Sequence, residues 1–374
     1  MSKPEPVLRV PYSYLDRQFA EVGPILEDIR SLVLSGDFTL GRPVSEFEER
    51  FARLIGTRYA VGVGSGTDAL RLCLKSLGVG PGDEVVTAAN TFVATAGAIE
   101  TAGARVVFVD CDDRFVMDPD KLERAITPRT KAVMPVHWGG QPADIESILA
   151  VAGRRGLSVV EDACQAIGAA RDGRKCGAIG VAAGFSLHPL KNINVWGDGG
   201  VITTDSEELR DGLRLQRNHG LTNRDEVAFY AYNSRLDSLQ AVVGNRLIQD
   251  MERITAARIA NAARLDAAFA PLHPRVVLPR RSPAERHVYH LYQFLAEDRD
   301  ALLEHLHARG VEAKVHYPVP LHLQPASRHL GYKAGDFPVA EAQARSILTL
   351  PVHQHLTDEE IEHMIRCVRG FYAR

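Results

Sequence analysis

An alternation of strand-like and helix-like segments between residues 55 and 205 constrains the fold of this chain more than any other feature of its sequence. Short runs rich in β-branched residues alternate there with stretches of helical spacing, the pattern of parallel strands joined by covering helices. We therefore expect an α/β layer. Its strands are predicted at residues 59–63, 84–87, 105–110, 131–136, 157–161, 183–187 and 201–204.

Helices are predicted over residues 67–77, 206–218 and 235–270, the last without proline and with Gly244 as its only glycine. Beyond Pro271 the pattern changes to an apolar strand, a helix at 299–309, a strand at 311–315 and a terminal helix from Asp358. At 374 residues the chain exceeds the roughly 100–200 residues of one ordinary domain. We expect a large domain over residues 1–250 and a smaller α+β domain over residues 251–374.

The charge and cysteine content narrow the class of protein. With 44 Lys and Arg against 47 Asp and Glu, the formal net charge of −3 does not favour a nucleic-acid or anionic membrane surface. No apolar stretch approaches the ~20 residues of a membrane span, and residues 1–22 lack a signal-peptide pattern. The five cysteines form no CxxC pair, and no HExxH or Cys/His quartet is present. We expect a cytoplasmic protein that binds no metal, no nucleic acid and no membrane.

The segment Gly64-Ser65-Gly66-Thr67 lies where a predicted strand ends and a helix begins. Free backbone N–H groups and the helix dipole make such a turn an anion site, and glycines let a phosphate approach closely. Two other interpretations remain. Ser65 or Thr67 could simply cap the helix. The glycines could also belong to the dinucleotide turn of a nicotinamide dehydrogenase, although Asp83 opens the next strand and that fingerprint needs an acidic residue at its end.

Two further motifs follow buried-looking strands. Glu161-Asp162 ends one strand, at the edge where ligands gather in α/β sheets, so a carboxylate there could hold a protonated heterocycle nitrogen or cap a helix. Lys191 follows another such strand, in a loop of aromatic, proline and glycine residues. A desolvated lysine can form a Schiff base, but most lysines are exposed, so an ordinary exposed loop lysine is the alternative. A phosphate cradle, a strand-end aspartate and a loop lysine are together the three anchors of pyridoxal phosphate.

Eight segments then carry a resemblance to a known family, in one order along nearly the whole chain. They are GDFTLGRPVSEFEERFA (36–52), GSGTDAL (64–70), GDEVVTAANTFVATAGAI (82–99), PVHWGGQPAD (135–144), EDACQAIGA (161–169), FSLHPLKNINVWGDGG (185–200), YNSRLDSLQA (232–241) and HYPVPLHLQ (316–324). On these segments the chain resembles the pyridoxal-phosphate sugar aminotransferases of the DegT/StrS type. The resemblance implies fold type I, an α/β fold with a large lobe whose mostly parallel mixed sheet is sandwiched by helices, and a smaller α+β C-terminal lobe.

Carried over residue by residue, the resemblance implies roles around pyridoxal 5'-phosphate. Lys191 would form the internal Schiff base and then move the proton, and Asp162 would keep the pyridine nitrogen protonated. Gln165 would hydrogen-bond the ring hydroxyl and Phe92 would stack on the ring. The phosphate would be held by Gly66, Thr67, Ser186 and, from the second subunit of a homodimer, Asn233. Contacts to the substrate are implied for His188, Arg235, His316, Tyr317 and His322.

The activity that the resemblance implies is transfer of an amino group from L-glutamate to a nucleotide-linked keto sugar, in amino-sugar, polysaccharide or glycosylated-metabolite biosynthesis, by a homodimer with shared active sites. Family members that carry histidine in place of the lysine dehydrate sugars, so Lys191 favours amino transfer. Two alternatives stay open. The enzyme could aminate a keto-cyclitol or another sugar without a nucleotide, or the protein could be a non-catalytic, regulatory binder of the cofactor.

Overall fold

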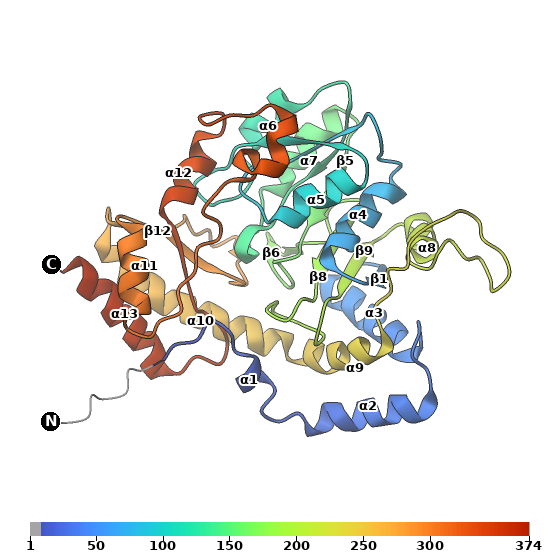
Figure 1. Cartoon of the computed structure of the whole chain (residues 1–374), viewed down its shortest axis with the longest axis horizontal. Coiled ribbons are helices and arrows are strands. Elements are labelled where there is room, and N and C mark those ends of the chain that lie inside the picture. The colour runs from blue at the N-terminus through green and yellow to red at the C-terminus, as the bar shows by residue number, and fades with distance from the viewer. Residues whose placement is uncertain (1–8, 374) are drawn as a thin grey trace.

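A seven-stranded sheet forms the centre of the large lobe in the computed structural model, which describes residues 9–373 (Figure 1). The strand order is β1-β9-β8-β5-β4-β2-β3, and β9 alone runs antiparallel to both of its neighbours. All seven predicted strands are present, each with ends within two residues of the prediction. They are β1 (Tyr59–Val63), β2 (Glu84–Ala88), β3 (Arg105–Val109), β4 (Thr130–Met134), β5 (Ser158–Asp162), β8 (Ala182–Ser186) and β9 (Gly200–Thr204).

Helices cover both faces of this sheet, as a mostly parallel sheet requires. The helices of the large lobe are α1 (Leu15–Gln18), α2 (Gly23–Ser35), α3 (Arg42–Ile55), α4 (Gly66–Ser76), α5 (Val93–Thr101), α6 (Pro119–Ala125), α7 (Ile145–Arg154), α8 (Glu207–Gln216) and α9 (Ser238–Leu247), with a 3-10 turn at Trp138–Gly140. Side chains of β8 and β9 alternate between two hydrophobic cores, one on each face of the sheet. Ala182 and Ile202 belong to the core that contains α4, whereas Phe185 belongs to the other core, where its ring centroid lies 5.0 Å from that of Phe51 of α3.

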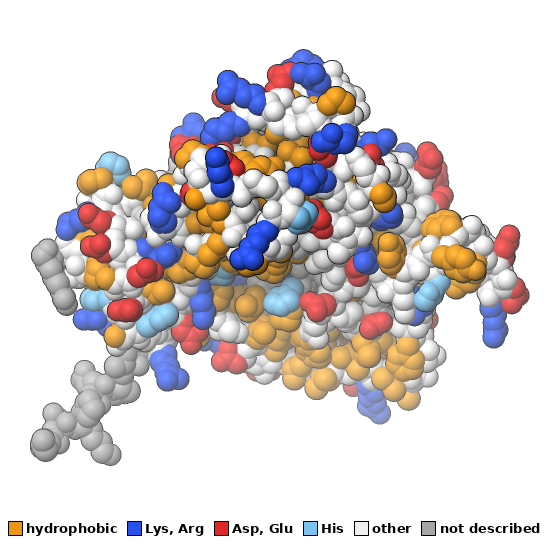
Figure 2. Space-filling model, turned by 45° about the horizontal axis from the view of Figure 1, so that its top comes forward, with side chains coloured by type: hydrophobic (Ala, Val, Ile, Leu, Met, Phe, Trp, Pro, Cys, Tyr) orange, Lys and Arg blue, Asp and Glu red, His pale blue; other side chains and the backbone are white. Residues whose placement is uncertain are grey.

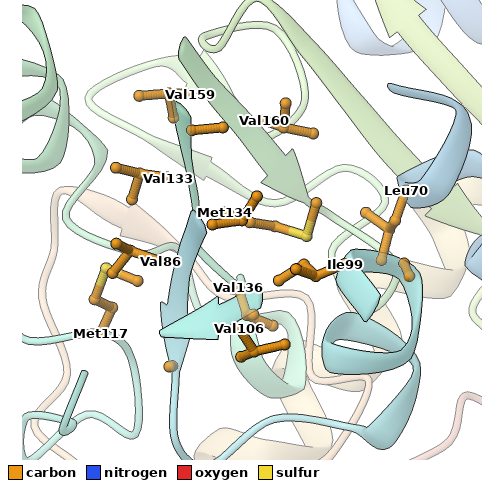
Figure 3. Packing of buried hydrophobic residues seen from close by; sticks show 14 of the residues in the cluster. Leu70, Val86, Ile99, Val106, Met117, Val133, Met134, Val136, Val159 and Val160 are labelled. Atoms are coloured by element: carbon orange, nitrogen blue, oxygen red, sulfur yellow. The ribbon is translucent and has the colours of Figure 1, made fainter. Parts of the chain in front are cut away.

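Branched and sulfur-containing side chains fill the core between the sheet, α4 and α5. Leu70 of α4, Ile99 of α5 and Met134 of β4 point into the same part of this core (Figure 3). Val86, Val133 and Val159 come from three adjacent strands, β2, β4 and β5, and are buried. The packing therefore fixes the carboxyl ends of these strands relative to one another.

The long helix predicted over residues 235–270 consists of two helices. It begins three residues late, at Ser238, because Asp237 and Gln240 form a capping box. A 3-10 turn at Ile248–Asp250 separates α9 from α10 (Met251–Phe269), and neither proline nor glycine marks this break in the sequence. Figure 1 shows α9 and α10 running in succession above α1 and α2 into the small lobe. A domain boundary at residue 250 stays a prediction.

The small lobe has a three-stranded sheet in the order β10-β12-β13. Its elements are β10 (Val276–Val277), β12 (Tyr292–Ala296), α11 (Arg299–His307), α12 (Pro338–Ser346), β13 (Ile347–Leu350) and α13 (Asp358–Tyr372), with 3-10 turns at Ala270–Leu272, Leu321–Leu323 and Pro325–Leu330. A further sheet of two-residue strands joins β11 (Glu285–Arg286) to β6 (Ala170–Arg171) and β7 (Arg174–Lys175).

The predicted strand at residues 311–315 is wrong. Val311 and Lys314 each make one isolated bridge, to Val10 and Thr349, and form no ladder. Val311 and Ala313 are nevertheless fully buried, so the apolar pattern there reflects burial of an irregular segment and not strand pairing. The third strand of this sheet is β13, which the sequence did not signal.

Within residues 9–373 no helix combines the length and apolar character needed to cross a membrane. The prediction about a signal peptide also concerns residues 1–8, which lie outside the described residues.

Candidate active site

A cavity of about 250 Å³ lies where β1, β5 and β8 end and where the small lobe meets the large one. Three segments that are far apart in the sequence form its walls: the turn before α4, the loop after β8 and the loop at residues 316–317. The cavity is lined by Tyr12, Ser65, Gly66, Thr67, Phe92, Ala94, Cys164, Ser186, His188, Leu190, Lys191, Asp198, His290, Leu291, His316 and Tyr317.

The turn before α4 has the form of an anion cradle. Ser65 is the N-cap and its hydroxyl accepts a hydrogen bond from the Asp68 N–H at 3.0 Å, so the capping role belongs to Ser65. The Thr67 hydroxyl faces the cavity and has no hydrogen-bond partner among residues 9–373. A Cβ at Gly66 would lie 2.6 Å from the Cβ of Ser186, so only glycine allows the turn to approach β8 this closely. The positive end of α4 therefore points its free N–H groups at the cavity beside two hydroxyl side chains.

The acidic pair at the end of β5 divides between the two faces of the sheet, because successive side chains of a strand alternate. Glu161 is fully buried and accepts hydrogen bonds from the N–H groups of Gly177, Ile179 and Gly180 at 2.7–2.8 Å. Its Oε2 also lies 2.9 Å from His137 Nε2. The Glu161 carboxylate thus has a structural role.

Asp162 lies on the other face, behind the wall of the cavity. Its Oδ1 accepts a hydrogen bond from the Cys164 N–H at 3.1 Å, and its Oδ2 accepts one from the Thr95 hydroxyl at 2.7 Å. The carboxylate is buried and close enough to Lys191 that its charge acts on the lysine. Of the two acidic residues, only Asp162 can therefore serve a ligand in the cavity.

Lys191 combines a fixed backbone with a free amine. Its N–H donates to the His188 carbonyl at 2.8 Å, and its own carbonyl accepts from the Tyr14 hydroxyl at 3.1 Å. The Nζ atom makes no hydrogen bond to any residue in the described range 9–373. Burial lowers the pKa of the Lys191 amine, against the opposing charges of Cys164 and Asp162. A lysine amine with a lowered pKa is more readily neutral and can attack a carbonyl carbon.

Aromatic rings line the mouth of the cavity. The Phe92 ring is 45% exposed, and its centroid lies 5.7 Å from that of Tyr317. Tyr317 also packs edge-on against Trp138, with centroids 5.6 Å apart. Phe92 thus has one ring face available to a planar ligand. Gln165 lies behind the wall, where its Oε1 accepts from the Gly139 N–H at 2.7 Å, which leaves its amide NH₂ group as a donor.

Most of the residues predicted for the site meet at this cavity. Those that line it are Gly66, Thr67, Phe92, Ser186, His188, Lys191, His316 and Tyr317. Asn233 is exposed in a loop away from the cavity, and Arg235 donates there to Asn218 Oδ1 at 3.1 Å. His322 is buried elsewhere, with Nε2 3.1 Å from Glu341 Oε1.

Thr95, Cys164 and His290 are among the residues of the site that were not singled out from the sequence. Thr95 and Cys164 lie inside family segments, but nothing in their spacing showed that both would contact Asp162. His290 lines the cavity and its Nδ1 is buried without a hydrogen-bond partner in the described part of the chain. Burial, with the charges of Lys191 and Arg258, holds the pKa of His290 well below its usual range. In the sequence, His290 precedes the apolar strand β12 and belongs to no recognisable motif.

Comparison with known proteins places the chain in a family. The model of the DegT/DnrJ/EryC1/StrS aminotransferase family matches residues 21–369. The chain is 41% identical to the pleiotropic regulatory protein of Geobacillus stearothermophilus, over 98% of this chain and 99% of that protein. It is 40% identical to dTDP-3-amino-3,4,6-trideoxy-alpha-D-glucose transaminase of Streptomyces venezuelae, over 98% and 97%. It is 39% identical to UDP-N-acetyl-3-dehydro-alpha-D-glucosamine 3-aminotransferase of Acidithiobacillus ferrooxidans, over 95% and 93%.

Solved structures share the fold. The crystal structure of S. venezuelae DesV in complex with a ketimine intermediate matches with a TM-score of 0.95 at 40% identity, over 98% of this chain and 99% of that chain. Spr1654 of Streptococcus pneumoniae in its PLP form matches with a TM-score of 0.90 at 28% identity, over 98% and 99%. The expected fold, a mainly parallel sheet between helices with a smaller lobe, is thereby confirmed.

The residues at the cavity fit pyridoxal 5'-phosphate, the cofactor of these proteins. The glycine-dependent cradle suits its phosphate, and the buried Asp162 carboxylate suits its protonated ring nitrogen. The Lys191 amine, which has no hydrogen-bond partner in the described part of the chain, suits its aldehyde. The predictions of family, fold, enzyme class and cofactor are therefore confirmed. The chain belongs to the DegT/DnrJ/EryC1/StrS aminotransferase family and is a pyridoxal-phosphate-dependent aminotransferase.

Proposed function

We propose that this aminotransferase transfers the amino group of L-glutamate to a keto sugar linked to a nucleoside diphosphate, producing an amino sugar for polysaccharide or glycosylated-metabolite biosynthesis. The observation that carries the proposal is the cavity in which the α4 cradle, Asp162 and Lys191 meet. Two relatives of this chain, at 40% and 39% identity, bear the names of enzymes acting on dTDP- and UDP-linked sugars. Their similarity extends over almost the full length of both chains, which supports the same substrate class here.

The residues of the site divide the work of amino transfer. When bound, pyridoxal phosphate supplies an aldehyde that accepts the amino group and a ring that withdraws electrons from the substrate carbon. The Lys191 amine would hold the cofactor through that aldehyde, and it is the group that would carry the proton between the two reacting carbons. Asp162 would accept a hydrogen bond from the ring nitrogen and so keep that nitrogen protonated.

The remaining cofactor contacts orient the ring. The N–H group of Gly66 and the hydroxyls of Thr67 and Ser186 would bind the phosphate at the start of α4. Phe92 would stack on the face of the ring, and the Gln165 NH₂ group, whose Oε1 is already bonded to Gly139, would donate to the ring oxygen. Together with Asp162, these groups would hold the ring from its face, its edge and its phosphate.

Side chains opposite the cradle are suited to bind sugar hydroxyls. Burial lowers the pKa of His316 to about 4, aided by Lys191 and Lys314, so its ring is neutral near pH 7. Burial raises the pKa of Tyr317 to about 12, so its phenol keeps its proton. Neutral donors and acceptors of this kind, together with His188, suit a polyhydroxylated substrate. His322, which was predicted to contact the substrate, does not line the cavity.

We also infer a homodimer whose sites are shared, with Asn233 and Arg235 reaching the site of the second subunit. Both residues are absent from the lining of their own cavity, and large apolar side chains are exposed elsewhere on the same chain. These side chains are on α2, on the segment after it and in the loop after α8: Leu26, Val33, Leu34, Phe38, Val227, Phe229 and Tyr230. Figure 2 shows hydrophobic side chains gathered along the lower edge of the molecule and on the projection at its right. A dimer interface would cover them.

A cytoplasmic location is part of the same proposal. All five cysteines are free thiols, as expected in a reducing compartment. The partners proposed are the two small-molecule substrates and a second copy of the chain, with neither nucleic acid nor membrane among them.

Steady-state assays with L-glutamate and a panel of keto sugars test the proposal. We expect turnover with dTDP- or UDP-linked keto sugars, and inhibition by free dTDP or UDP that competes with the sugar nucleotide. Turnover of a keto-cyclitol without inhibition by nucleotides would instead support a substrate without a nucleotide. Absence of turnover with every sugar, in protein that binds the cofactor, would support a regulatory protein like the one named in G. stearothermophilus.

A further inference from the structure

Two buried threonine hydroxyls lie in line behind the Asp162 carboxylate. Thr91 and Thr95 flank the start of α5 and are 2% and 1% exposed. The Thr95 Oγ1 lies 2.7 Å from Asp162 Oδ2, and the Thr91 Oγ1 lies 2.7 Å from Thr95 Oγ1. Burial excludes water as a competing partner for these groups.

The direction of both hydrogen bonds follows from the number of hydrogens. An ionised carboxylate can only accept, so the single hydroxyl hydrogen of Thr95 goes to Asp162. Thr91 must then be the donor in the Thr91–Thr95 bond. The two hydroxyls form a one-way chain that ends on the carboxylate, and each bond polarises and strengthens the next.

The second oxygen of the carboxylate is held from another element. Asp162 Oδ1 accepts from the Cys164 N–H at 3.1 Å, in the turn that follows β5. The backbone of Asp162 is fixed as well, because its N–H donates to the Pro135 carbonyl at 2.9 Å and its carbonyl accepts from the His137 N–H at 3.1 Å. Rotation of the carboxylate would break the hydrogen bonds to both of its oxygens.

We propose that Thr95, supported by Thr91, is a positioning residue for amino transfer that holds the Asp162 carboxylate in the plane in which it meets the cofactor ring nitrogen. The inference rests on the proposed function, in which Asp162 pairs with that nitrogen. Phe92, which stacks on the ring, lies between the two threonines in the chain. The segment 91–95 therefore sets both the face of the ring and the partner of its nitrogen.

The test compares Thr95→Val, which keeps the branched shape and removes the hydroxyl, with Thr95→Ser, which keeps the hydroxyl. In the holoenzyme we expect Thr95→Val to lower kcat about 10- to 100-fold, the effect of one hydrogen bond to a charged group, with KM for the keto sugar within about 2-fold. Thr95→Ser should stay within about 3-fold of wild-type kcat. Thr91→Val should give a smaller loss than Thr95→Val, because it acts through one more bond.

Thr87→Val is the matched control. Thr87 is equally buried, and its hydroxyl donates to the Met134 carbonyl at 2.8 Å, away from Asp162. This variant should lose stability and keep kcat. An equal loss of kcat in Thr87→Val, a Thr95→Ser variant as slow as Thr95→Val, or a Thr95→Val variant with wild-type kcat would each overturn the proposal.

Asp162→Asn separates this proposal from the proposed function. If Asp162→Asn is slow and Thr95→Val adds no further loss to it, Thr95 acts through Asp162 as proposed. If Asp162→Asn is slow and the two losses multiply, the positioning role is overturned while the proposed function stands. If Asp162→Asn keeps wild-type kcat, the role of Asp162 in the proposed function fails and this inference fails with it.

Discussion

The chemistry of the site depends on how each side chain is held. Lys191 has both of its backbone polar groups bonded and a side-chain amine with no partner among residues 9–373, so its backbone is fixed and its amine is free for the reaction proposed above. Asp162 is the reverse case, since both of its carboxylate oxygens are bonded. A covalent anchor needs an available atom, whereas an electrostatic partner needs a fixed one.

Side chains at strand ends could be predicted from the sequence, and those that arrive through tertiary contacts could not. Lys191 and Asp162 follow apolar strands, so the topology of an α/β sheet already places them at one edge. Tyr12 reaches the cavity from the N-terminal segment, and His290 reaches it from the segment just before β12 of the small lobe. No spacing in the chain relates either residue to the loop after β8, and only the packing of the two lobes brings them there.

The lowered pKa of Lys191 predicts how the apoenzyme takes up its cofactor. Only the neutral amine attacks the aldehyde, so the attack rate should rise with pH and level off above the pKa of Lys191. Because burial lowers that pKa, we expect levelling at a pH below 10.5, the ordinary lysine value. The attack rate at each pH is measured by stopped-flow absorbance after pyridoxal phosphate is mixed with apoenzyme. A rate that still rises tenfold per pH unit at pH 10.5 would contradict the lowered pKa.

Elements bring the site together through a few very close approaches. The start of α4 touches the end of β8 at Gly66, and Gly200 of β9 passes so near Ser65 that a Cβ there would lie 2.4 Å from the Ser65 carbonyl oxygen. The seven strands were predictable from their β-branched runs. The strand at 311–315 was predicted wrongly and β13 was missed, since short apolar segments in the small lobe are buried whether or not they pair.

Gly66→Ala should weaken cofactor binding by pushing α4 away from β8. The added methyl would lie 2.6 Å from the Ser186 Cβ and 3.1 Å from the Cys164 Sγ, so the cradle must open. We expect the Kd for pyridoxal phosphate, measured by titration of apoenzyme, to rise at least about 10-fold, equivalent to about 1.4 kcal/mol. Gly153→Ala is the control, because Gly153 lies within α7 with no atom in the way of a Cβ. Equal Kd values in wild type and Gly66→Ala would count against the cradle.

The N-terminal segment is joined to the small lobe by a buried histidine, which predicts a pH dependence of stability. His353 is 2% exposed and its Nε2 lies 3.1 Å from the Pro11 carbonyl oxygen. Burial lowers the pKa of His353 from 6.5 to about 4. Between these two pKa values the unfolded chain binds more protons at this histidine than the folded protein does. The stability contributed by neutral His353 is therefore complete above pH 6.5 and is lost as the pH falls towards 4.

His353→Gln should therefore reduce the loss of stability on acidification. Between pH 7.5 and pH 5.0 the histidine accounts for about 2 kcal/mol of the free energy of unfolding. Urea unfolding at the two pH values should show a smaller difference in the variant than in wild type. His273→Gln, at an exposed position, is the control and should behave as wild type. A variant with the full wild-type difference would show that His353 is not the group responsible.

At the level of the whole molecule, the single chain forms the cavity but leaves Asn233 and Arg235 outside its lining. In Figure 1, α9 and α10 run in succession between the two lobes. Large apolar side chains of α2 and of the loop after α8 are exposed to solvent within residues 9–373. A protein that stays soluble as a single chain seldom exposes so many large apolar residues together. The proposed dimer accounts for both observations.

Mixing two inactive variants tests whether the sites are shared. Lys191→Ala removes the proposed covalent anchor, and Asn233→Ala removes the proposed contact to the phosphate of the second subunit. If Asn233 acts across the interface, a mixed dimer contains one doubly damaged site and one intact site, and activity should recover to about a quarter of wild type in an equimolar, re-equilibrated mixture. If Asn233 acts within its own chain, every site in a mixed dimer carries one of the two substitutions and no activity should return. No recovery in mixtures shown to contain mixed dimers would refute sharing.

In the proposed function, Lys191 holds the cofactor through which an amino group passes from L-glutamate to a nucleotide-linked keto sugar. The most direct measurement is the visible absorbance of the lysine-bound cofactor during the two half-reactions. We predict that L-glutamate abolishes the band in wild-type enzyme, that a dTDP- or UDP-linked keto sugar restores it, and that Lys191→Ala never shows it. A band that persists with glutamate, or that is unchanged in Lys191→Ala, would refute the proposed function.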